Sequence, residues 1–295
     1  MPALGCQSFT LSRCFTLIPP INPTKPFLIM SQSTTADPAF SAVRYVSTND
    51  AYDRWAKVYD SDGNFLQALD DMELKTLFPR FLTSIKSPEP WRIVDLGCGT
   101  GRNTALLLGV PSSEIIALDS SKGMLEVAKT RLSGSDAAAS GTTSLRFDIF
   151  DMLATSAAPA CVAPHTADAV ISTLVAEHVP LPAFFAHVAQ LLRPGGVLLL
   201  TNMHSEMGSI SQAGFVDAAT GEKIRPTSYA HTVEDVVTEA RRHGLEAEED
   251  GEGTGILERA VGEDMVGRLG PRSKKWVGVT CWFGGILRKV DTSQG

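Results

Sequence analysis

The chain has 295 residues, of which 43% are hydrophobic and 20% are charged, as is ordinary for a globular protein with one large domain or two small ones. Its net charge of −7 disfavours nucleic acid as a partner, because an acidic surface repels phosphate backbones. The five cysteines are scattered, without a CxxC motif or a His/Cys cluster, so we expect free thiols in a reducing compartment and no zinc site. No apolar run reaches about 18 residues, and we expect no membrane span.

The first residues have a composition of their own. Residues 1–36 contain no acidic residue and are rich in Ser, Thr and Pro, which predicts a disordered leader or tail over residues 1–46. Two alternatives stay open: residues 1–29 are a mitochondrial transit peptide, or Met30 is the true start. Apart from the transit-peptide alternative, we expect a cytoplasmic protein.

Apolar residues first recur at helical spacing between Tyr52 and Leu82, which predicts a helical cap before the main fold. A Ser-Pro-Glu-Pro segment ending at Pro90 breaks this pattern. Apolar strands then alternate with helical segments. The predicted strands span residues 92–95, 114–119, 145–150, 167–172 and 197–201. Three helices are predicted: one begins at Thr104, and the other two span residues 122–132 and 181–192.

The regular alternation ends after Thr201. An Ala-Thr-Gly-Glu segment at 219–222 predicts a hairpin turn between two short runs. An amphipathic helix follows, with Thr232 as its N-cap and Gly244 at its end. Residues 276–283 predict a final long strand.

This succession of strands and helices predicts an α/β fold with a doubly wound, mostly parallel sheet. We expect seven strands in a Rossmann-like arrangement, with helices on both faces. Residues 47–291 are predicted to form a single domain, with a lid inserted at about 204–231.

A glycine-rich loop, Asp95-Leu-Gly-Cys-Gly-Thr-Gly101, follows the first of the alternating strands. Its spacing is G-x-G-x-G and differs from the G-x-G-x-x-G of dinucleotide-binding loops. Glycines at such a turn let a ligand approach the backbone closely. Asp95 would repel a diphosphate, whereas its charge suits an ammonium or sulfonium group. The loop therefore predicts a cationic cofactor.

Acidic residues also follow the next two strands. Asp119 lies at the carboxyl end of the second strand, where an acidic side chain can accept hydrogen bonds from ribose hydroxyls. Asp151 follows the third strand and is expected to accept from an adenine amino group, with Met152 against the ring. Asp148 is the alternative if the register differs. Because the carboxyl ends of parallel strands share one edge of the sheet, these residues predict a nucleoside site.

At these residues the sequence resembles the class I methyltransferases, in particular the small-molecule group, often called type 11, that includes the ubiquinone/menaquinone C-methyltransferases. The resemblance covers about Tyr52 to Thr201. Besides the glycine loop it rests on residues 52–60, 117–125, 150–152, 167–178 and 191–200, the last with Leu-Arg-Pro-Gly-Gly.

The resemblance implies S-adenosylmethionine as the cofactor. The loop glycines would line its methionine part, Asp119 its ribose, and Asp151 with Met152 its adenine. Asp95 would lie near the amino acid end, and Thr173 would approach the sulfonium. The residues expected at the cofactor are Tyr52, Trp55, Asp95, Gly97, Cys98, Gly99, Gly101, Asp119, Ser120, Met124, Asp151, Met152, Thr173 and His178.

Methyl transfer from a sulfonium needs alignment and exclusion of water, and it needs a base only if the acceptor must lose a proton. The candidate catalytic bases are His204, after the fifth strand, and His231, in the expected lid; a surface histidine is the alternative for each. For His178 a structural role is favoured over catalysis. Trp55 fits an acceptor pocket and the core equally well.

We therefore expect an S-adenosylmethionine-dependent methyltransferase that acts on a small organic acceptor. It is expected to be a monomer or homodimer, with no metal, nucleic acid or membrane partner. Two alternatives remain at this point. One is an NAD(P)-dependent oxidoreductase, and the other is a non-catalytic cofactor-binding or regulatory protein on the same fold.

Overall fold

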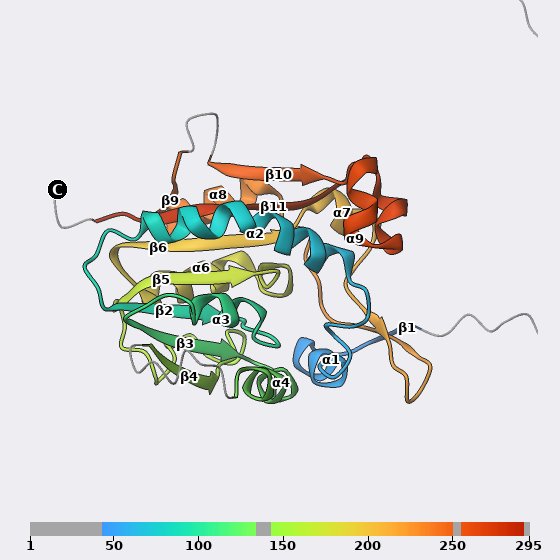
Figure 1. Cartoon of the computed structure of the whole chain (residues 1–295), viewed down its shortest axis with the longest axis horizontal. Coiled ribbons are helices and arrows are strands. Elements are labelled where there is room, and N and C mark those ends of the chain that lie inside the picture. Colours follow the sequence, from blue (N-terminus) through green and yellow to red (C-terminus); the bar gives the residue numbers. More distant parts are fainter. Residues whose placement is uncertain (1–42, 134–142, 250–254, 292–295) are drawn as a thin grey trace, which may run out of the picture. The chain divides into compact units, whose positions relative to one another are not determined.

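The computed structural model describes residues 43–133, 143–249 and 255–291 (Figure 1). Residues 1–42 of the expected leader lie outside the described residues, as does most of the Gly/Ser/Ala-rich segment 133–141. Strand β1 (Val43–Tyr45) lies inside the span expected to be a leader, so the folded part begins before residue 47.

The main sheet follows the order β10-β11-β6-β5-β2-β3-β4 (Figure 1). Strands β2 to β6 pair in parallel, and β11 pairs antiparallel with β6. Short strands β9 and β10 pair with different parts of the same edge of β11, so the sheet has seven strand positions. The mostly parallel seven-stranded sheet predicted from the sequence is thus confirmed. The strand bounds are β2 Trp91–Leu96, β3 Ser113–Asp119, β4 Ser144–Ile149, β5 Ala167–Thr173, β6 Leu192–Met203, β9 Leu245–Ala247, β10 Ile256–Ala260 and β11 Thr280–Lys289.

Helices cover both faces of this sheet, as expected. Successive side chains of a strand point to opposite faces, and β2 shows the result: Ile93 belongs to one apolar core and Val94 to the other. The first core is shared with α2 (Phe65–Ser84) and α3 (Arg102–Leu107). The second is shared with α6 (Leu181–Leu191) and α8 (Val233–Arg242). Helix α4 spans Lys122–Leu132.

The continuous helical pattern expected from Tyr52 to Leu82 is in fact two helices. Helix α1 spans Thr48–Trp55 and α2 begins at Phe65. Between them Gly63 has a φ of +74°, and the side chain of Asn64 caps α2 by accepting from the amide of Leu66. Apolar spacing continues across the break because both helices bury one side, so periodicity alone did not reveal it.

The last strand also differs from its prediction. It begins at Thr280, because the preceding residues form 3₁₀ helix η3 (Pro271–Trp276). Gly278, with a φ of +85°, separates η3 from β11. Trp276 packs in the core from this 3₁₀ helix, and Val277 and Val279, which follow it, are partly buried against the same core.

The segment expected to be a lid contains α7 (Ser205–Ile210), β7 (Phe215–Val216) and β8 (Lys223–Arg225). Strands β7 and β8 form the antiparallel hairpin predicted from the turn at 219–222. Strand β1 pairs in parallel with β8, so the residues just before α1 are joined to this hairpin. Helix α8 begins at the predicted N-cap Thr232, whose hydroxyl accepts from the amide of Asp235. None of the helices in the described part of the chain is long and apolar enough to cross a membrane.

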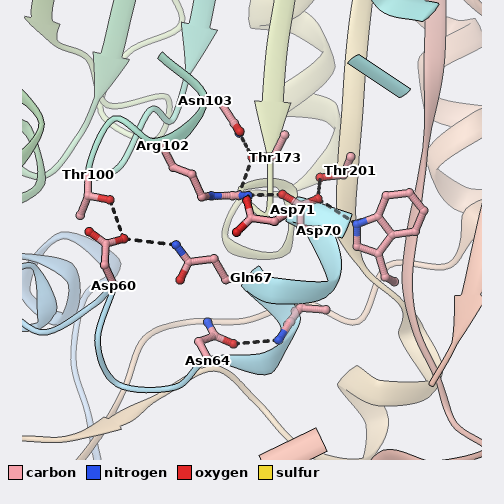
Figure 2. Close-up of polar contacts among 12 residues, drawn as sticks. Asp60, Asn64, Gln67, Asp70, Asp71, Thr100, Arg102, Asn103, Thr173 and Thr201 are labelled. Carbon is pink, nitrogen blue, oxygen red and sulfur yellow. Dashed lines mark hydrogen bonds and ion pairs between the residues drawn. The ribbon is translucent and has the colours of Figure 1, made fainter. Parts of the chain in front are cut away.

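A buried carboxylate joins α2 to the sheet (Figure 2). Asp70 has no exposed surface and accepts from Nη2 of Arg102 at 2.6 Å, from the hydroxyl of Thr201 at 2.6 Å and from the indole of Trp282 at 2.9 Å. Arg102 also pairs with Asp71, whose side chain is half exposed. A buried charge is tolerated when it is paired and fully hydrogen-bonded in this way.

Replacing Asp70 by alanine is expected to lower the free energy of unfolding by about 3 kcal/mol, because the largely buried guanidinium of Arg102 would lose its fully buried counter-charge and two further donors would lose their acceptor. The matched control Asp71→Ala removes the exposed partner of the same arginine and should cost about 1 kcal/mol or less. Urea unfolding of both variants measures the difference. Equal losses would contradict the role given to Asp70.

Candidate active site

The glycine loop turns from β2 into α3 with Gly97, Gly99 and Gly101 all at positive φ. A Cβ on Gly97 would lie 2.3 Å from the side chain of Val175, so only glycine fits there. A Cβ on Gly99 would meet nothing within 4 Å; the missing side chain leaves open space beside the backbone. The loop therefore combines one close packing contact with one position at which a ligand can reach the main chain.

The open space belongs to a cavity, here called cavity 1, at the carboxyl ends of β2, β3 and β5 and beside the residues after β4. It brings together ten of the residues that the sequence predicted at a cofactor: Tyr52, Gly97, Gly99, Asp119, Ser120, Met124, Asp151, Met152, Thr173 and His178. It is also lined by residues that the prediction missed: Thr48, Asn49, Tyr59, Leu96, Phe150, Leu153, Leu174, Val175 and Val179. Leu96, Phe150, Leu174 and Val175 lie in segments that carry the family resemblance, but the sequence does not predict a role at the cofactor for any of them; Leu153 and Val179 lie outside those segments.

Asp119 ends β3 and fixes the loop from the cavity wall. Its Oδ2 accepts from the amide of Gly99 and its Oδ1 from the amide of Ser121, both at 2.8 Å. Burial raises the pKa of Asp119 to about 6, while these amide contacts favour its charged form. Each oxygen has further acceptor capacity, so the carboxylate can take two hydroxyl donors from a ligand.

Asp151 is linked to the helical cap. Its Oδ2 accepts from the side-chain amide of Asn49 in α1 at 2.8 Å, and its Oδ1 accepts from the amide of Leu153. Asp148, the alternative considered from the sequence, instead lies 3.7 Å from Arg146 in an exposed ion pair and does not line cavity 1. The adenine-side candidates Asp151 and Met152 therefore lie next to α1.

His178 and Tyr52 form a hydrogen-bonded pair in the wall of cavity 1. The imidazole Nδ1 is 2.7 Å from the carbonyl oxygen of Thr227, and Nε2 is 2.7 Å from the hydroxyl of Tyr52. A carbonyl only accepts, so Nδ1 carries the proton and Nε2 accepts from Tyr52. Burial lowers the pKa of His178 to about 4. This histidine is therefore neutral and holds α1 against the residues after β5.

Four of the residues expected at the cofactor lie outside the lining of cavity 1. Asp95 is buried beneath the loop, where it accepts from the hydroxyl of Thr104 at 2.6 Å, and burial raises its pKa to about 7. Cys98 is buried, which raises the pKa of its thiol. Gly101 faces α4, where an added Cβ would lie 3.1 Å from Ala128. Trp55 lines a second cavity instead.

The two candidate bases lie outside the linings of both cavities. His204 caps α7 by accepting from the amide of Glu206 through Nδ1, and its Nε2 is 3.1 Å from Glu258. The Nε2 of His231 is about 3 Å from the carbonyl oxygens of Ala176 and Val179. Both imidazoles therefore have local partners that explain their positions. Within residues 43–133, 143–249 and 255–291, no group of three or more His, Cys, Asp or Glu side chains could hold a metal ion.

The second cavity, here called cavity 2, shares Tyr52, Tyr59 and Leu174 with cavity 1. Aromatic rings form much of its wall, including Trp55, whose ring stacks on that of Phe215 outside the lining with centroids 5.0 Å apart. Its ionisable lining residues are Tyr52, Tyr59, Asp62, Glu177, Arg272 and Lys275. The two cavities therefore have a common wall, to which Tyr52 and Tyr59 contribute from α1 and the segment after it and Leu174 from the position directly after β5.

Comparison with known proteins identifies the family. A family model described as a methyltransferase domain matches residues 94–200. An uncharacterized methyltransferase of Emericella nidulans is 47% identical over 261 residues, which cover 82% of this chain and 91% of the relative. The chain belongs to the class I S-adenosylmethionine-dependent methyltransferases.

Other similarities are narrower. A trans-aconitate 2-methyltransferase of Acidovorax sp. is 40% identical over 119 residues, which are 40% of each chain. The structure of a complex of DhpI with SAH has a TM-score of 0.53 at 18% identity and covers 82% of this chain and 94% of that one, which shows the shared fold. The cofactor of this methyltransferase is S-adenosylmethionine, and the oxidoreductase alternative is wrong.

The neutral state of His178 is open to direct measurement. Its side-chain ¹⁵N shifts are expected to stay constant between pH 7 and pH 5, because burial holds its pKa near 4. Two-dimensional ¹H–¹⁵N spectra of the imidazoles measure this, and His178→Gln identifies the signal. A midpoint near the ordinary value of about 6.5 would contradict the buried hydrogen-bonded arrangement.

Proposed function

We propose that the methyltransferase binds S-adenosylmethionine in cavity 1 and transfers its methyl group to a small organic acceptor in cavity 2 by in-line displacement. The observation that carries this proposal is the common wall of the two cavities, formed by Tyr52, Tyr59 and Leu174. In-line displacement requires donor and acceptor atoms at a defined short separation, and two adjoining cavities provide such an arrangement.

The residues of cavity 1 fit the cofactor. Asp119 presents a partly buried carboxylate that accepts from two backbone amides, which suits the two hydroxyls of a ribose. Open space beside Gly99 allows the methionine part to lie against the main chain. Asp151 and Met152 provide an acceptor and a thioether surface for an adenine. When bound, the cofactor supplies a methyl group activated on sulfur.

The chain's own task is then to position the acceptor and exclude water. Rings of Tyr52, Trp55 and Tyr59 lie 5.0 to 5.9 Å apart, centroid to centroid, and provide an apolar surface beside the place where the two cavities adjoin. Helix α1 is held over cavity 1 by the Asn49–Asp151 and Tyr52–His178 hydrogen bonds. A dry, closed site favours alignment and prevents hydrolysis.

The names of the partial relatives support a small acceptor. They include trans-aconitate 2-methyltransferases and ubiquinone biosynthesis O-methyltransferases, whose alignments cover about 40 to 48% of this chain. The mixed aromatic and charged lining of cavity 2 suits an organic molecule with an apolar body and polar substituents.

The cofactor seat is tested by Asp119→Ala, which should weaken binding of S-adenosylhomocysteine by about 1–3 kcal/mol through loss of charge-assisted hydrogen bonds. The matched control is Asp148→Ala, which removes a carboxylate near the end of the neighbouring strand β4 but outside cavity 1. Isothermal titration calorimetry measures both. Equal dissociation constants for Asp119→Ala and the unaltered protein would count against this seat.

Catalysis is tested by incubating the full chain with S-adenosylmethionine and an acceptor panel and measuring S-adenosylhomocysteine. The panel consists of two protic acceptors, catechol and benzylamine, and two carboxylates, benzoate and trans-aconitate. The proposal predicts turnover with at least one of them. Tight cofactor binding without turnover of any panel member would favour the non-catalytic alternative.

A further inference from the structure

Two carboxylates that line cavity 2, those of Asp62 and Glu177, have a buried oxygen without a hydrogen-bond partner among the described residues. The unpartnered oxygen of Asp62 lies 4.0 Å from Nη1 of Arg272, which compensates its charge, whereas Glu177 has no such counter-charge in the described part of the chain. Glu177 lines this cavity, and only 4% of the residue is exposed. Its Oε2 is buried and, among the described residues, receives no hydrogen bond. Buried polar atoms in proteins almost always have a hydrogen-bond partner, so an unpartnered carboxylate oxygen on a residue that lines a cavity points to a ligand that donates one.

The local fold holds Glu177 beside the meeting point of the cavities. It lies in the 3₁₀ turn η1 (Ala176–His178) directly after β5, three residues beyond Leu174 of the shared wall. Its backbone amide donates to the side-chain oxygen of Asn202 in β6 at 3.0 Å, which fixes the turn against the sheet. The next residue, His178, lines cavity 1. Glu177 is thus near both the donor and the acceptor sides.

The backbone amides of Met203 and of Glu177 itself favour the ionised carboxyl, but no neighbour among the described residues donates to Oε2. The Nε2 of His178 is 3.9 Å from its Oε1, but that nitrogen already accepts from Tyr52. The other ionisable groups that face it are Asp70 of α2, Tyr52 and Tyr59 of the cap, and His231 before α8. No lysine or arginine of the described residues pairs with it. Glu177 therefore has an open hydrogen-bond site and little charge compensation.

We propose that Glu177 is the catalytic base of this methyltransferase and that its acceptor is protic, a hydroxyl or an amine that donates a hydrogen bond to Oε2. The inference rests on the proposed function. As the acceptor's oxygen or nitrogen forms a bond to the methyl carbon, the carbon–sulfur bond breaks and its electron pair stays on sulfur. The acceptor's proton moves to Oε2 of Glu177, so charge and atoms balance.

If Glu177 is the base, the acceptor group is a hydroxyl or an amine and not a carboxylate. A carboxylate nucleophile has no proton to lose, and beside Glu177 it would meet a like charge, which disfavours having both groups ionised. A hydroxyl or amine satisfies the unpartnered oxygen instead. The acceptor chemistry expected here therefore differs from that of a protein acting on trans-aconitate as a carboxylate.

Burial also gives Glu177 suitable acid–base behaviour, since it raises the pKa of the carboxyl to about 7. A base works best with a pKa near the working pH. Because the ionised form must take the proton, kcat should rise with pH through about 7. Replacing the carboxylate of Glu177 should abolish this rise of kcat with pH.

The test compares Glu177→Gln with the unaltered protein, using catechol and benzylamine as protic acceptors and benzoate and trans-aconitate as carboxylate acceptors. Glutamine keeps an accepting oxygen but takes no proton. We expect kcat with the protic acceptors to fall about 100-fold or more, with little change in KM and loss of the limb near pH 7. The dissociation constant of S-adenosylhomocysteine should be unchanged, which also shows that the variant is folded.

The matched control is Glu239→Gln. Glu239 is a buried glutamate of α8, 8% exposed and bonded to Arg242, and it lies outside both cavities, so this variant should keep full activity. Undiminished turnover of the protic acceptors by Glu177→Gln would overturn the inference. Turnover of the carboxylates alone would overturn it while leaving the proposed function intact. No turnover of any acceptor would contradict the proposed function and this inference together.

Discussion

The structure depends on the buried carboxylate of Asp70. Through its three hydrogen bonds it connects helix α2 with the start of α3, with β6 and with β11, which lie far apart in the sequence. Arg102, the main counter-charge, directly follows the last glycine of the loop. The interaction that anchors α2 to the sheet (Figure 2) therefore also fixes where α3 begins, and with it the glycine turn beside cavity 1.

Around this anchor the cap is held by polar contacts from its own acidic and amide side chains. Asp53 accepts from the hydroxyl of Ser121 and the amide of Gly123 at the start of α4. Asp60 accepts from the hydroxyl of Thr100 in the glycine loop at 2.9 Å and pairs with Arg131. These contacts align the aromatic residues of the cap with the edge of the sheet. Cap and loop form one assembly, and the two cavities share a wall as a result.

The sequence was most informative where a local pattern determines local structure. Alternating strands and helices, the glycine loop and the acidic residue ending β3 were all predicted, because period and turn chemistry are local properties. The Asp70 network was missed, since no local signal connects it to Thr201 or Trp282. Periodicity also merged α1 with α2, because both helices bury an apolar side.

The candidate bases were also predicted without knowledge of their three-dimensional surroundings. The sequence predicts His204 as a base because it follows the fifth strand and His231 because it lies in the expected lid, but the sequence does not show which way a side chain points. In the structure one caps α7 and the other contacts backbone carbonyls. Glu177 directly precedes His178, and nothing in the sequence alone is a reason to choose it as a base. Its significance depends on burial and on the lack of a partner for Oε2 among the described residues, and neither property can be read from residue order.

The most direct test of the account is a crystal structure of the protein with S-adenosylhomocysteine bound. The account predicts that the ribose hydroxyls lie within hydrogen-bond distance of Asp119, the adenine beside Asp151 and Met152, and the sulfur towards the wall shared with cavity 2. Density for the ligand outside cavity 1, or with its sulfur turned away from Tyr52 and Leu174, would contradict it.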